Sequence, residues 1–174
     1  MKTETQTLTA DTAREYKAPS GARIGHVHLK VSDLDRAIGF YHGLLGFDLT
    51  MMYGGQAAFL SAGGYHHHIG LNTWYSLNAP QARKQTVGLY HTAFLYPTRR
   101  ELAEIYDRLR KQGYPLRGAS DHGVSEALYL DDPDGNGVEL YWDRPQELWP
   151  KDAKGRLTMF TRPLDLDDLL AELK

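Results

Sequence analysis

The sequence predicts an α+β protein made of two consecutive βαβββ modules, and an internal repeat is the main reason for this prediction. Residues 24–46 and a second stretch that begins at Gly88 share one pattern, in which a strand with a histidine is followed by a helix and a glycine. Adding 65 to a residue number in the first stretch places His26 on His91 and aligns the apolar positions of the two helices. A repeat that preserves both features indicates two copies of one structural unit. The matching histidines further predict that both modules close around one shared cup.

The overall composition excludes several classes of protein. The chain has 174 residues, enough for one domain or two small fused modules, and its net charge of −2 provides no basic face for nucleic acid. It contains no cysteine, which excludes disulfides, thiolate metal sites and a cysteine nucleophile. No apolar run approaches the ~20 residues of a membrane span, and the N-terminal segment lacks the apolar core of a secretory signal. We therefore expect a cytoplasmic protein without a membrane partner.

The first module is expected to follow a polar N-terminal arm. Ser32 with Asp35 has the pattern of a capping box at the start of the helix. Gly46 is expected to end this helix, because glycine accepts a left-handed backbone without penalty. A hairpin is predicted at Gly54 and Gly55, and three consecutive histidines fall in the fourth strand. The expected ranges are 1–20 for the arm, 21–75 for the module, and 23–31, 47–53, 56–62 and 66–74 for its strands.

The second module repeats this order after a polar linker. Thr98 and Glu101 have capping-box spacing, and Gly113 is expected to end the helix. A C-terminal tail ends in a short acidic amphipathic helix, whose leucines need a surface of this domain or of a second subunit. We expect a homo-oligomer, a dimer or larger. The expected ranges are 76–87 for the linker, 88–146 for the module, 89–96, 115–119, 126–130 and 138–142 for its strands, 147–174 for the tail and 164–173 for the tail helix.

Three side chains of the two modules have the chemistry of a metal site. Strand residues alternate between faces, so Glu139 points away from Val138 and Leu140, which are expected to pack on the helices. In a shared cup Glu139 could meet His26 and His91. Two imidazoles and one carboxylate leave coordination positions open, which suits non-haem Fe(II). Each residue taken alone is more often structural, as a hydrogen-bonded histidine or a paired charge.

The arrangement of motifs resembles the vicinal oxygen chelate superfamily, which contains glyoxalases, bleomycin-resistance proteins and extradiol dioxygenases. The resemblance covers about residues 22–146 and rests on GHVHLKVSDLDRAIGFYHGLLGF and DPDGNGVELYWD. Three further stretches, HHHIGLNTW, GLYHTAF and TRPLDLDDLL, are similar to the small catechol 2,3-dioxygenase-like proteins. The resemblance implies a fold of two βαβββ modules that form one metal-containing cup.

The resemblance also implies roles for individual residues. The iron triad of the family falls on His26, His91 and Glu139. A catalytic acid–base histidine falls on His67, and a tyrosine ten residues before the ligand glutamate falls on Tyr129. A further histidine, which lies outside the ligand set and upstream of that tyrosine, falls on His122, although its spacing to the tyrosine differs from that in the larger enzymes.

Several of these residues have other interpretations. His28 shares a strand face with His26 and is a rival ligand. The histidine run of residues 66–68 could be a surface cluster, and Tyr129 and His122 could be core and turn residues. Glyoxalase-type members carry a second ligand glutamate at the place of Gly70, where a glycine offers no side-chain ligand.

The function implied is extradiol ring cleavage of a catecholic substrate by O2 at Fe(II), with Mn(II) as the alternative metal. Two other functions stay open, a glyoxalase-type isomerase or lyase and a non-catalytic small-molecule-binding protein. The sequence leaves open the ring substituents, the oligomeric state, and whether one chain or two complete the site.

Overall fold

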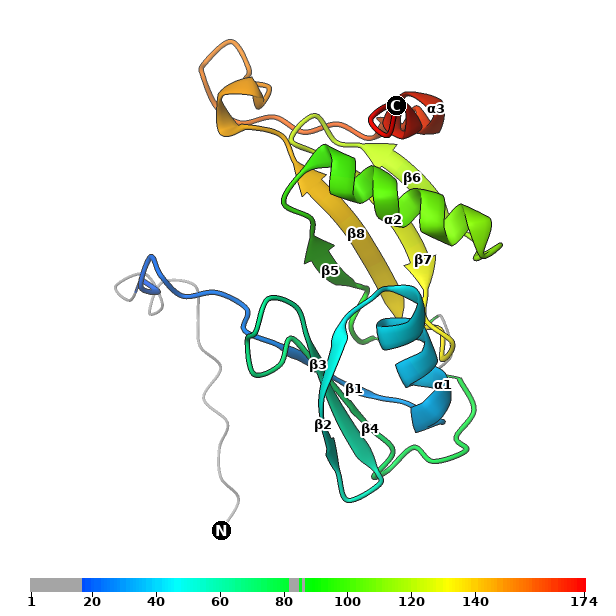
Figure 1. Cartoon of the computed structure of the whole chain (residues 1–174). Helices are drawn as coiled ribbons and strands as arrows, with labels where there is room; N and C mark the ends of the chain where they lie inside the picture. Colours follow the sequence, from blue (N-terminus) through cyan, green and yellow to red (C-terminus); the bar gives the residue numbers. More distant parts are fainter. Residues whose placement is uncertain (1–16, 82–84, 86) are drawn as a thin grey trace.

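The computed structural model describes residues 17–81, 85 and 87–174 and contains two β-sheets, one from each half of the chain (Figure 1). The first sheet has the strand order β1-β4-β3-β2, and the second has the order β5-β8-β7-β6-β9. This confirms the predicted α+β class and the two βαβββ modules. Most of the expected N-terminal arm and part of the expected linker lie outside the described residues.

In the first module a parallel pair of strands lies beside an antiparallel hairpin. β1 runs parallel to β4, and β3 pairs antiparallel with both β4 and β2. The hairpin turn places Gly54 and Gly55 at φ 57° and 66°, the left-handed values that favour glycine. The elements are β1 (Val27–Lys30), α1 (Leu34–Ile38), a π-helical turn η1 (Gly39–Leu44), β2 (Asp48–Tyr53), β3 (Ala57–Ser61) and β4 (Ile69–Asn72).

The second module repeats this topology and adds a strand from the tail. β5 runs parallel to β8, while β6, β7 and β8 form an antiparallel meander whose edge pairs with β9. The elements are β5 (Thr92–Leu95), α2 (Arg99–Lys111), β6 (Gly118–Asp121), β7 (Ser125–Asp131), β8 (Gly137–Asp143), the 3₁₀ turn η2 (Gln146–Leu148), β9 (Arg162–Pro163) and α3 (Leu166–Ala171). None of the described helices is long and apolar enough to span a membrane.

The helix caps follow the sequence expectation in one module and differ from it in the other. The Thr98 hydroxyl caps α2 by accepting from the Glu101 amide and donating to the Glu101 carboxylate. In the first module, however, Asp33 rather than Ser32 caps α1, through a hydrogen bond from the Arg36 amide. Ser32 instead binds the other module, a contact that no local pattern reports.

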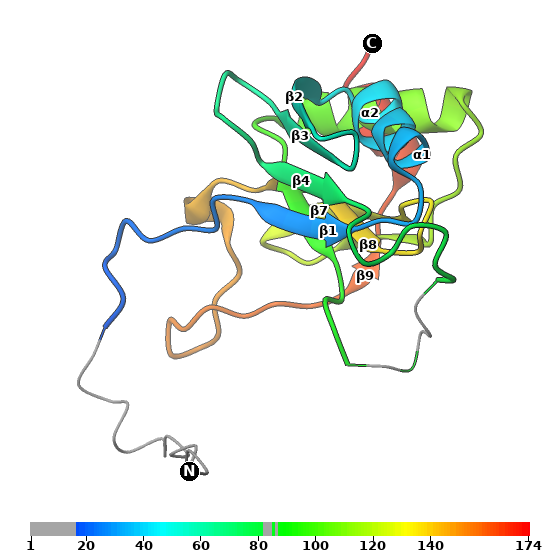
Figure 2. The same ribbon diagram turned by 90° about the horizontal axis from the view of Figure 1, so that it is seen from below.

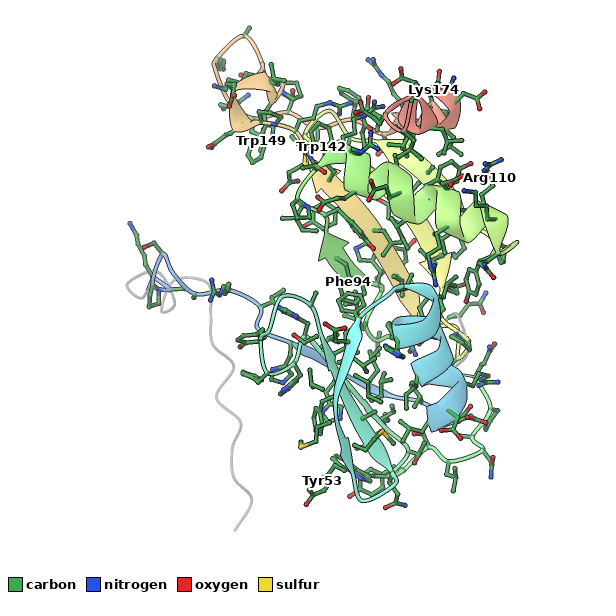
Figure 3. All side chains as sticks on the ribbon, in the orientation of Figure 1. Tyr53, Phe94, Arg110, Trp142, Trp149 and Lys174 are labelled. Atoms are coloured by element: carbon green, nitrogen blue, oxygen red, sulfur yellow. The ribbon has the colours of Figure 1, made fainter. Side chains whose placement is uncertain are left out.

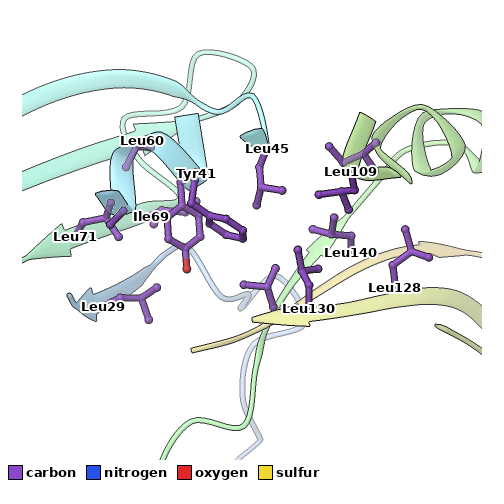
Figure 4. Packing of buried hydrophobic residues seen from close by; sticks show 14 of the residues in the cluster. Leu29, Tyr41, Leu45, Leu60, Ile69, Leu71, Leu109, Leu128, Leu130 and Leu140 are labelled. Atoms are coloured by element: carbon purple, nitrogen blue, oxygen red, sulfur yellow. The ribbon is translucent and has the colours of Figure 1, made fainter. Parts of the chain in front are cut away.

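The two modules share one apolar core on the helix side of their sheets. α1 and α2 both lie on this side (Figure 2). Figure 4 shows Leu29 and Tyr41 of the first module facing Leu130 and Leu140 of the second, and all four are buried. Phe94 lies where the modules meet (Figure 3), and its ring centroid is 4.9 Å from that of Phe47.

Hydrogen bonds at the turn between β7 and β8 also join the modules. The buried Tyr41 hydroxyl donates to Asp132 at 3.0 Å. The Ser32 hydroxyl and the Arg36 guanidinium both donate to Asp134, each at 2.6 Å. Buried, satisfied polar groups of this kind are costly to separate. The relative placement of the modules is therefore fixed by polar contacts as well as by the core.

The tail helix α3 packs on its own chain. The sequence had allowed either this or packing of its leucines on a second subunit. Leu169 is fully buried in the shared core. Arg99 at the start of α2 donates to Asp168 and Glu172 of the tail and to the buried Glu126 of β7. Burial opposes the charge on Arg99, but these hydrogen bonds outweigh it and raise the pKa of the guanidinium. The charged contact thus fastens the tail to the second sheet.

Candidate functional site

The second module brings His91 and Glu139 together on the side of its sheet away from the helices. His91 precedes β5, and Glu139 lies in the middle of the parallel neighbour β8, opposite Ala93. His91 Nε2 is 2.9 Å from Glu139 Oε2, and both side chains are partly exposed. Val138 and Leu140 are buried on the opposite face, which is the alternation that the sequence predicted. An imidazole nitrogen and a carboxylate oxygen therefore face the same small volume.

Tyr129 and His122 extend this pair into a row of hydrogen bonds. Tyr129 of β7 lies directly opposite Glu139, and its hydroxyl is 3.1 Å from Glu139 Oε1. His122 Nε2 is 2.8 Å from the same hydroxyl. Burial, followed by the charge on Glu139, raises the pKa of Tyr129 above its ordinary range, so the phenol keeps its proton. A cavity of about 350 Å³ runs beside His91, His122 and Tyr129.

The tail holds His122 through a contact that the sequence did not reveal. His122 Nδ1 is 3.0 Å from the Phe160 carbonyl oxygen and 3.2 Å from the Thr161 hydroxyl. A carbonyl can only accept, so Nδ1 carries a proton. Gly123 adopts φ 79° beside His122, and a Cβ there would lie 2.6 Å from the Phe160 ring. In the sequence, only Gly123 hints at this contact. A glycine there permits the left-handed turn and lets the Phe160 ring pack close to the backbone.

The proton count in this row depends on the charge of His122. Tyr129 has one hydroxyl proton and two neighbours that could accept it, His122 and Glu139. If His122 is neutral with its proton on Nδ1, the tyrosine can donate only to Nε2 or to the carboxylate. If His122 is an imidazolium, Nε2 donates to the tyrosine oxygen and the tyrosine donates to Glu139. The charged form satisfies every contact in the row.

The first module carries a separate group of histidines. His26 immediately precedes β1, and its ring centroid is 4.5 Å from that of His67. The run His66–His68 lies in a bend before β4 rather than inside the expected strand of residues 66–74. His68 Nδ1 is within hydrogen-bond distance of the Ser61 hydroxyl, whereas the His67 ring contacts the Phe59 ring. Burial and the nearby charge of His26 lower the pKa of His67.

His28 packs over a glycine on the same sheet. It lies opposite Gly70 of β4, and a Cβ at Gly70 would lie 2.9 Å from the His28 ring. Its ring is also 5.6 Å from the Trp74 ring centroid. Gly70 therefore stands where glyoxalase-type members carry the second glutamate, and the His28 imidazole covers it. A larger side chain at Gly70 would force the His28 ring to move.

One chain does not bring the three expected ligands into one place. His91 and Glu139 are adjacent, but His26 lies with His67 in the other module. Among the described residues, no group of three histidine or carboxylate side chains is arranged to hold a metal ion. His91 Nδ1 is buried without a hydrogen-bond partner in the described part of the chain. The expected site residues therefore lie in two separate groups, one in each module, and each group is called a half-site below.

Comparisons with known proteins agree on the family. The family model described as Glyoxalase/Bleomycin resistance protein/Dioxygenase superfamily matches residues 23–140. A catechol-2,3-dioxygenase of Bacillus subtilis (strain 168) is 41% identical over 149 residues, which cover 86% of this chain and 51% of the relative. Biphenyl-2,3-diol 1,2-dioxygenase 3 of Rhodococcus globerulus is 37% identical over 122 residues, covering 70% of this chain and 63% of the relative. The chain thus spans about half the length of the first relative and less than two thirds of the second.

A solved structure supports the fold. The crystal structure of a glyoxalase/dioxygenase from Nostoc punctiforme matches with a TM-score of 0.61 and 19% identity. The match covers 75% of this chain and 97% of that protein. At this identity the likeness establishes the fold alone.

Proposed function

Because the chain belongs to the Glyoxalase/Bleomycin resistance protein/Dioxygenase superfamily, we propose that it is an extradiol dioxygenase, which opens the ring of a catecholic substrate with O2. Fe(II) is the proposed metal and Mn(II) the alternative. The row from His91 through Glu139 and Tyr129 to His122, beside a cavity of about 350 Å³, is the observation that carries the proposal. Two relatives whose names describe dioxygenases of aromatic diols add support.

The proposed metal ligands are His26, His91 and Glu139. Imidazole nitrogen and carboxylate oxygen are donors that suit non-haem iron, and three such ligands leave room for substrate and O2. The 2.9 Å between His91 Nε2 and Glu139 Oε2 fits two donors directed at one position. When bound, the metal would hold the diol and O2 side by side and pass electrons between them.

The remaining residues would manage protons and charge. Neutral His67 would accept a proton from the bound diol and return it later in the reaction, a task suited to an imidazole near neutral pH. Tyr129, which keeps its proton, and His122 would donate hydrogen bonds to oxygen atoms that gain negative charge. Both oxygen atoms of O2 would enter the product, a ring-opened semialdehyde in which one carbon of the broken ring bond has become a carboxylate and the other an aldehyde.

The test measures oxygen consumption. The protein is first loaded with metal under anaerobic conditions, and O2 is then admitted together with the substrate. Purified protein is loaded with Fe(II) or Mn(II) and given catechol or 2,3-dihydroxybiphenyl, and the O2 consumed is compared with the coloured ring-opened product. We expect one O2 per product and loss of bound metal in Glu139→Gln. Protein that binds metal and diol but consumes no O2 would contradict the proposal.

A glyoxalase-type isomerase is the second candidate, because the family description includes glyoxalases. Its four-ligand site requires a carboxylate where this chain has Gly70 under the His28 ring. We therefore expect no isomerisation of the hemithioacetal of methylglyoxal and glutathione by protein loaded with Zn(II) or Ni(II). A protein that binds diols without turning them over would instead favour the binding-module alternative.

A further inference from the structure

The tail returns to the second sheet beside His122, the last residue of the row that begins at His91. β9 of the tail pairs with the edge strand β6, and Phe160 lies just before β9. Phe160 makes two contacts with His122. Its amide donates to the His122 carbonyl oxygen at 3.3 Å, and its own carbonyl oxygen lies 3.0 Å from His122 Nδ1. The tail therefore contacts both the backbone and the ring of His122.

The side chain of Phe160 holds this carbonyl in place. A Cβ on Gly123 would lie 2.6 Å from the Phe160 ring and 2.9 Å from Pro150 Cγ, so the ring packs closely on the backbone of the turn. The guanidinium carbon of Arg162 lies 4.2 Å from the centroid of the same ring. A cation over an aromatic face is attracted to it. The direction in which the Phe160 carbonyl accepts is thus fixed by packing on two neighbours.

The fixed carbonyl restricts where His122 can carry its proton. In a neutral imidazole one nitrogen donates and the other accepts, and the partner of one nitrogen decides the role of the other. With its proton on Nε2 alone, the ring would turn the lone pair of Nδ1 toward the carbonyl oxygen of Phe160, which repels it. The Thr161 hydroxyl, 3.2 Å from Nδ1, can donate or accept and suits either form. Nδ1 therefore keeps its proton, and only Nε2 gains or loses one.

Nε2 is the ring nitrogen that faces the proposed reaction site. It lies 2.8 Å from the Tyr129 hydroxyl, which in turn lies 3.1 Å from Glu139. His122, Tyr129 and Thr161 all line the cavity of about 350 Å³. The tail thus binds the nitrogen on the far side of the ring and leaves the nitrogen on the cavity side to the row.

Other contacts fasten the tail independently of His122. Leu169 is fully buried in the shared core, and Arg99 donates to Asp168 and Glu172. The pairing of β9 with β6 adds backbone hydrogen bonds. A change in the Phe160 side chain should therefore alter the contact with His122 without releasing the tail.

We propose that Phe160 is a positioning residue for the reaction, because its carbonyl oxygen keeps a proton on Nδ1 of His122. His122 then exchanges protons at Nε2 alone, on the side of Tyr129 and the cavity. A proton that Nε2 receives comes from the cavity side and returns to it. In the charged ring Nε2 donates a hydrogen bond, and in the neutral ring it accepts one. The inference rests on the proposed function, because it assigns a task to the same row.

The first test locates the proton directly. Proton–nitrogen NMR correlation spectra distinguish an imidazole nitrogen that carries a proton from one that does not. They are recorded on metal-free wild-type protein at a pH at which the ring is neutral, and His122→Gln identifies the signals among the eight histidines. We expect the proton on Nδ1. A proton on Nε2, or an even mixture of the two forms, would overturn the inference.

The second test loosens the carbonyl. Phe160→Ala keeps the backbone but removes the packed ring, so we expect a mixture of proton positions on His122. The metal content and the KM for the diol should stay near wild type. We expect kcat to fall by up to about 10²-fold, the typical effect of displacing a catalytic group by about 1 Å. Phe160→Tyr, which keeps the ring, should retain most of the wild-type kcat.

A neighbouring residue provides the matched control. Met159 is 62% exposed, and Met159→Ala should leave both the NMR signals of His122 and kcat unchanged. Phe160→Leu repeats the experiment with a smaller loss of volume if Phe160→Ala unfolds. A folded Phe160→Ala or Phe160→Leu variant with the NMR signals and the kcat of the wild type would show that Phe160 does not position His122.

The inference and the proposed function can fail separately. A proton on Nε2 in wild-type protein that consumes O2 would overturn the positioning role and leave the dioxygenase proposal standing. Wild-type protein that consumes no O2 would contradict the dioxygenase proposal, and the NMR measurement on metal-free protein would still decide which nitrogen of His122 carries the proton.

Discussion

Replacing Gly137 with alanine should disturb both the second sheet and the half-site beside it. A Cβ on Gly137 would lie 2.2 Å from the Tyr90 carbonyl oxygen and 3.1 Å from His91 Cβ. The first distance is about 1.2 Å short of the 3.4 Å at which ordinary contact begins. The opposing atom belongs to the backbone, so no side-chain rotation relieves the overlap. Either β8 or the segment that carries His91 must move.

The size of the effect follows from this overlap. Overpacking of a well-packed region typically costs about 1–3 kcal/mol of unfolding free energy. For a domain of this size each kcal/mol lowers Tm by about 2–4 °C, so we expect a fall of several degrees in thermal unfolding followed by circular dichroism. Movement of His91 away from Glu139 should also weaken Mn(II) binding, measured by calorimetry.

Gly118 provides the matched control, because it lies in β6 of the same sheet and an added Cβ would meet no described atom within 4 Å. Gly118→Ala should keep both the Tm and the Mn(II) affinity of the wild type. A Gly137→Ala variant that unfolds at the wild-type temperature would show that the Tyr90 carbonyl does not restrict the residue at this position.

Three further predictions concern a cap, a proton carrier and an ion pair. Thr98→Ala should lower the unfolding free energy by about 1 kcal/mol in urea titrations through loss of the α2 cap, and an unchanged midpoint would contradict the cap assignment. His67→Ala should keep its metal and slow turnover about 10²–10⁴-fold, whereas His68→Ala should leave turnover per folded molecule near wild type; equal effects would count against the assigned role. Burial opposes ionisation of Asp121, but hydrogen bonds from Arg144 and a backbone amide outweigh it and hold its pKa below the ordinary value. Ionised Asp121 therefore stabilises the folded state at pH values above its unfolded pKa of about 3.9, and this stabilisation is lost as pH falls through the lower folded pKa. In acid unfolding titrations the difference in unfolding free energy between wild type and Asp121→Asn should therefore disappear. A difference that stays constant with pH would contradict this linkage.

Local structure was predictable wherever a short pattern carries the information. Thr98 with Glu101 predicted the start of α2 correctly, because a cap depends on neighbours three residues apart. The same logic failed at Ser32, which binds Asp134 in the other module and leaves the cap to Asp33. A hydrogen bond over such a separation in sequence competes with the local one and leaves no periodic trace.

The candidate site shows the same division. Alternation along β8 placed Glu139 on the face away from the helices, and the repeat paired His26 with His91. Neither pattern describes how the two modules pack, which depends on the shared core and on the turn between β7 and β8. Within one chain His26 therefore lies apart from His91 and Glu139, and the sequence had left open whether one chain or two complete the site. The contact between Phe160 and His122 could not be predicted from a local pattern either, because it joins the tail to a turn 38 residues earlier.

The connection between the last two strands has a different task in each copy of the repeat. In the second module it carries Asp132 and Asp134, which bind Tyr41 and Ser32 and hold the halves of the molecule together. In the first module the corresponding connection, between β3 and β4, carries the histidine run that contains His67. The same loop position thus joins the two modules in one repeat and carries the histidine run in the other. Exchanging the sequences of these two loops would therefore remove the contacts of Asp132 and Asp134 with the first module and would also displace the histidine run. Each loop would still join an equivalent pair of antiparallel strands.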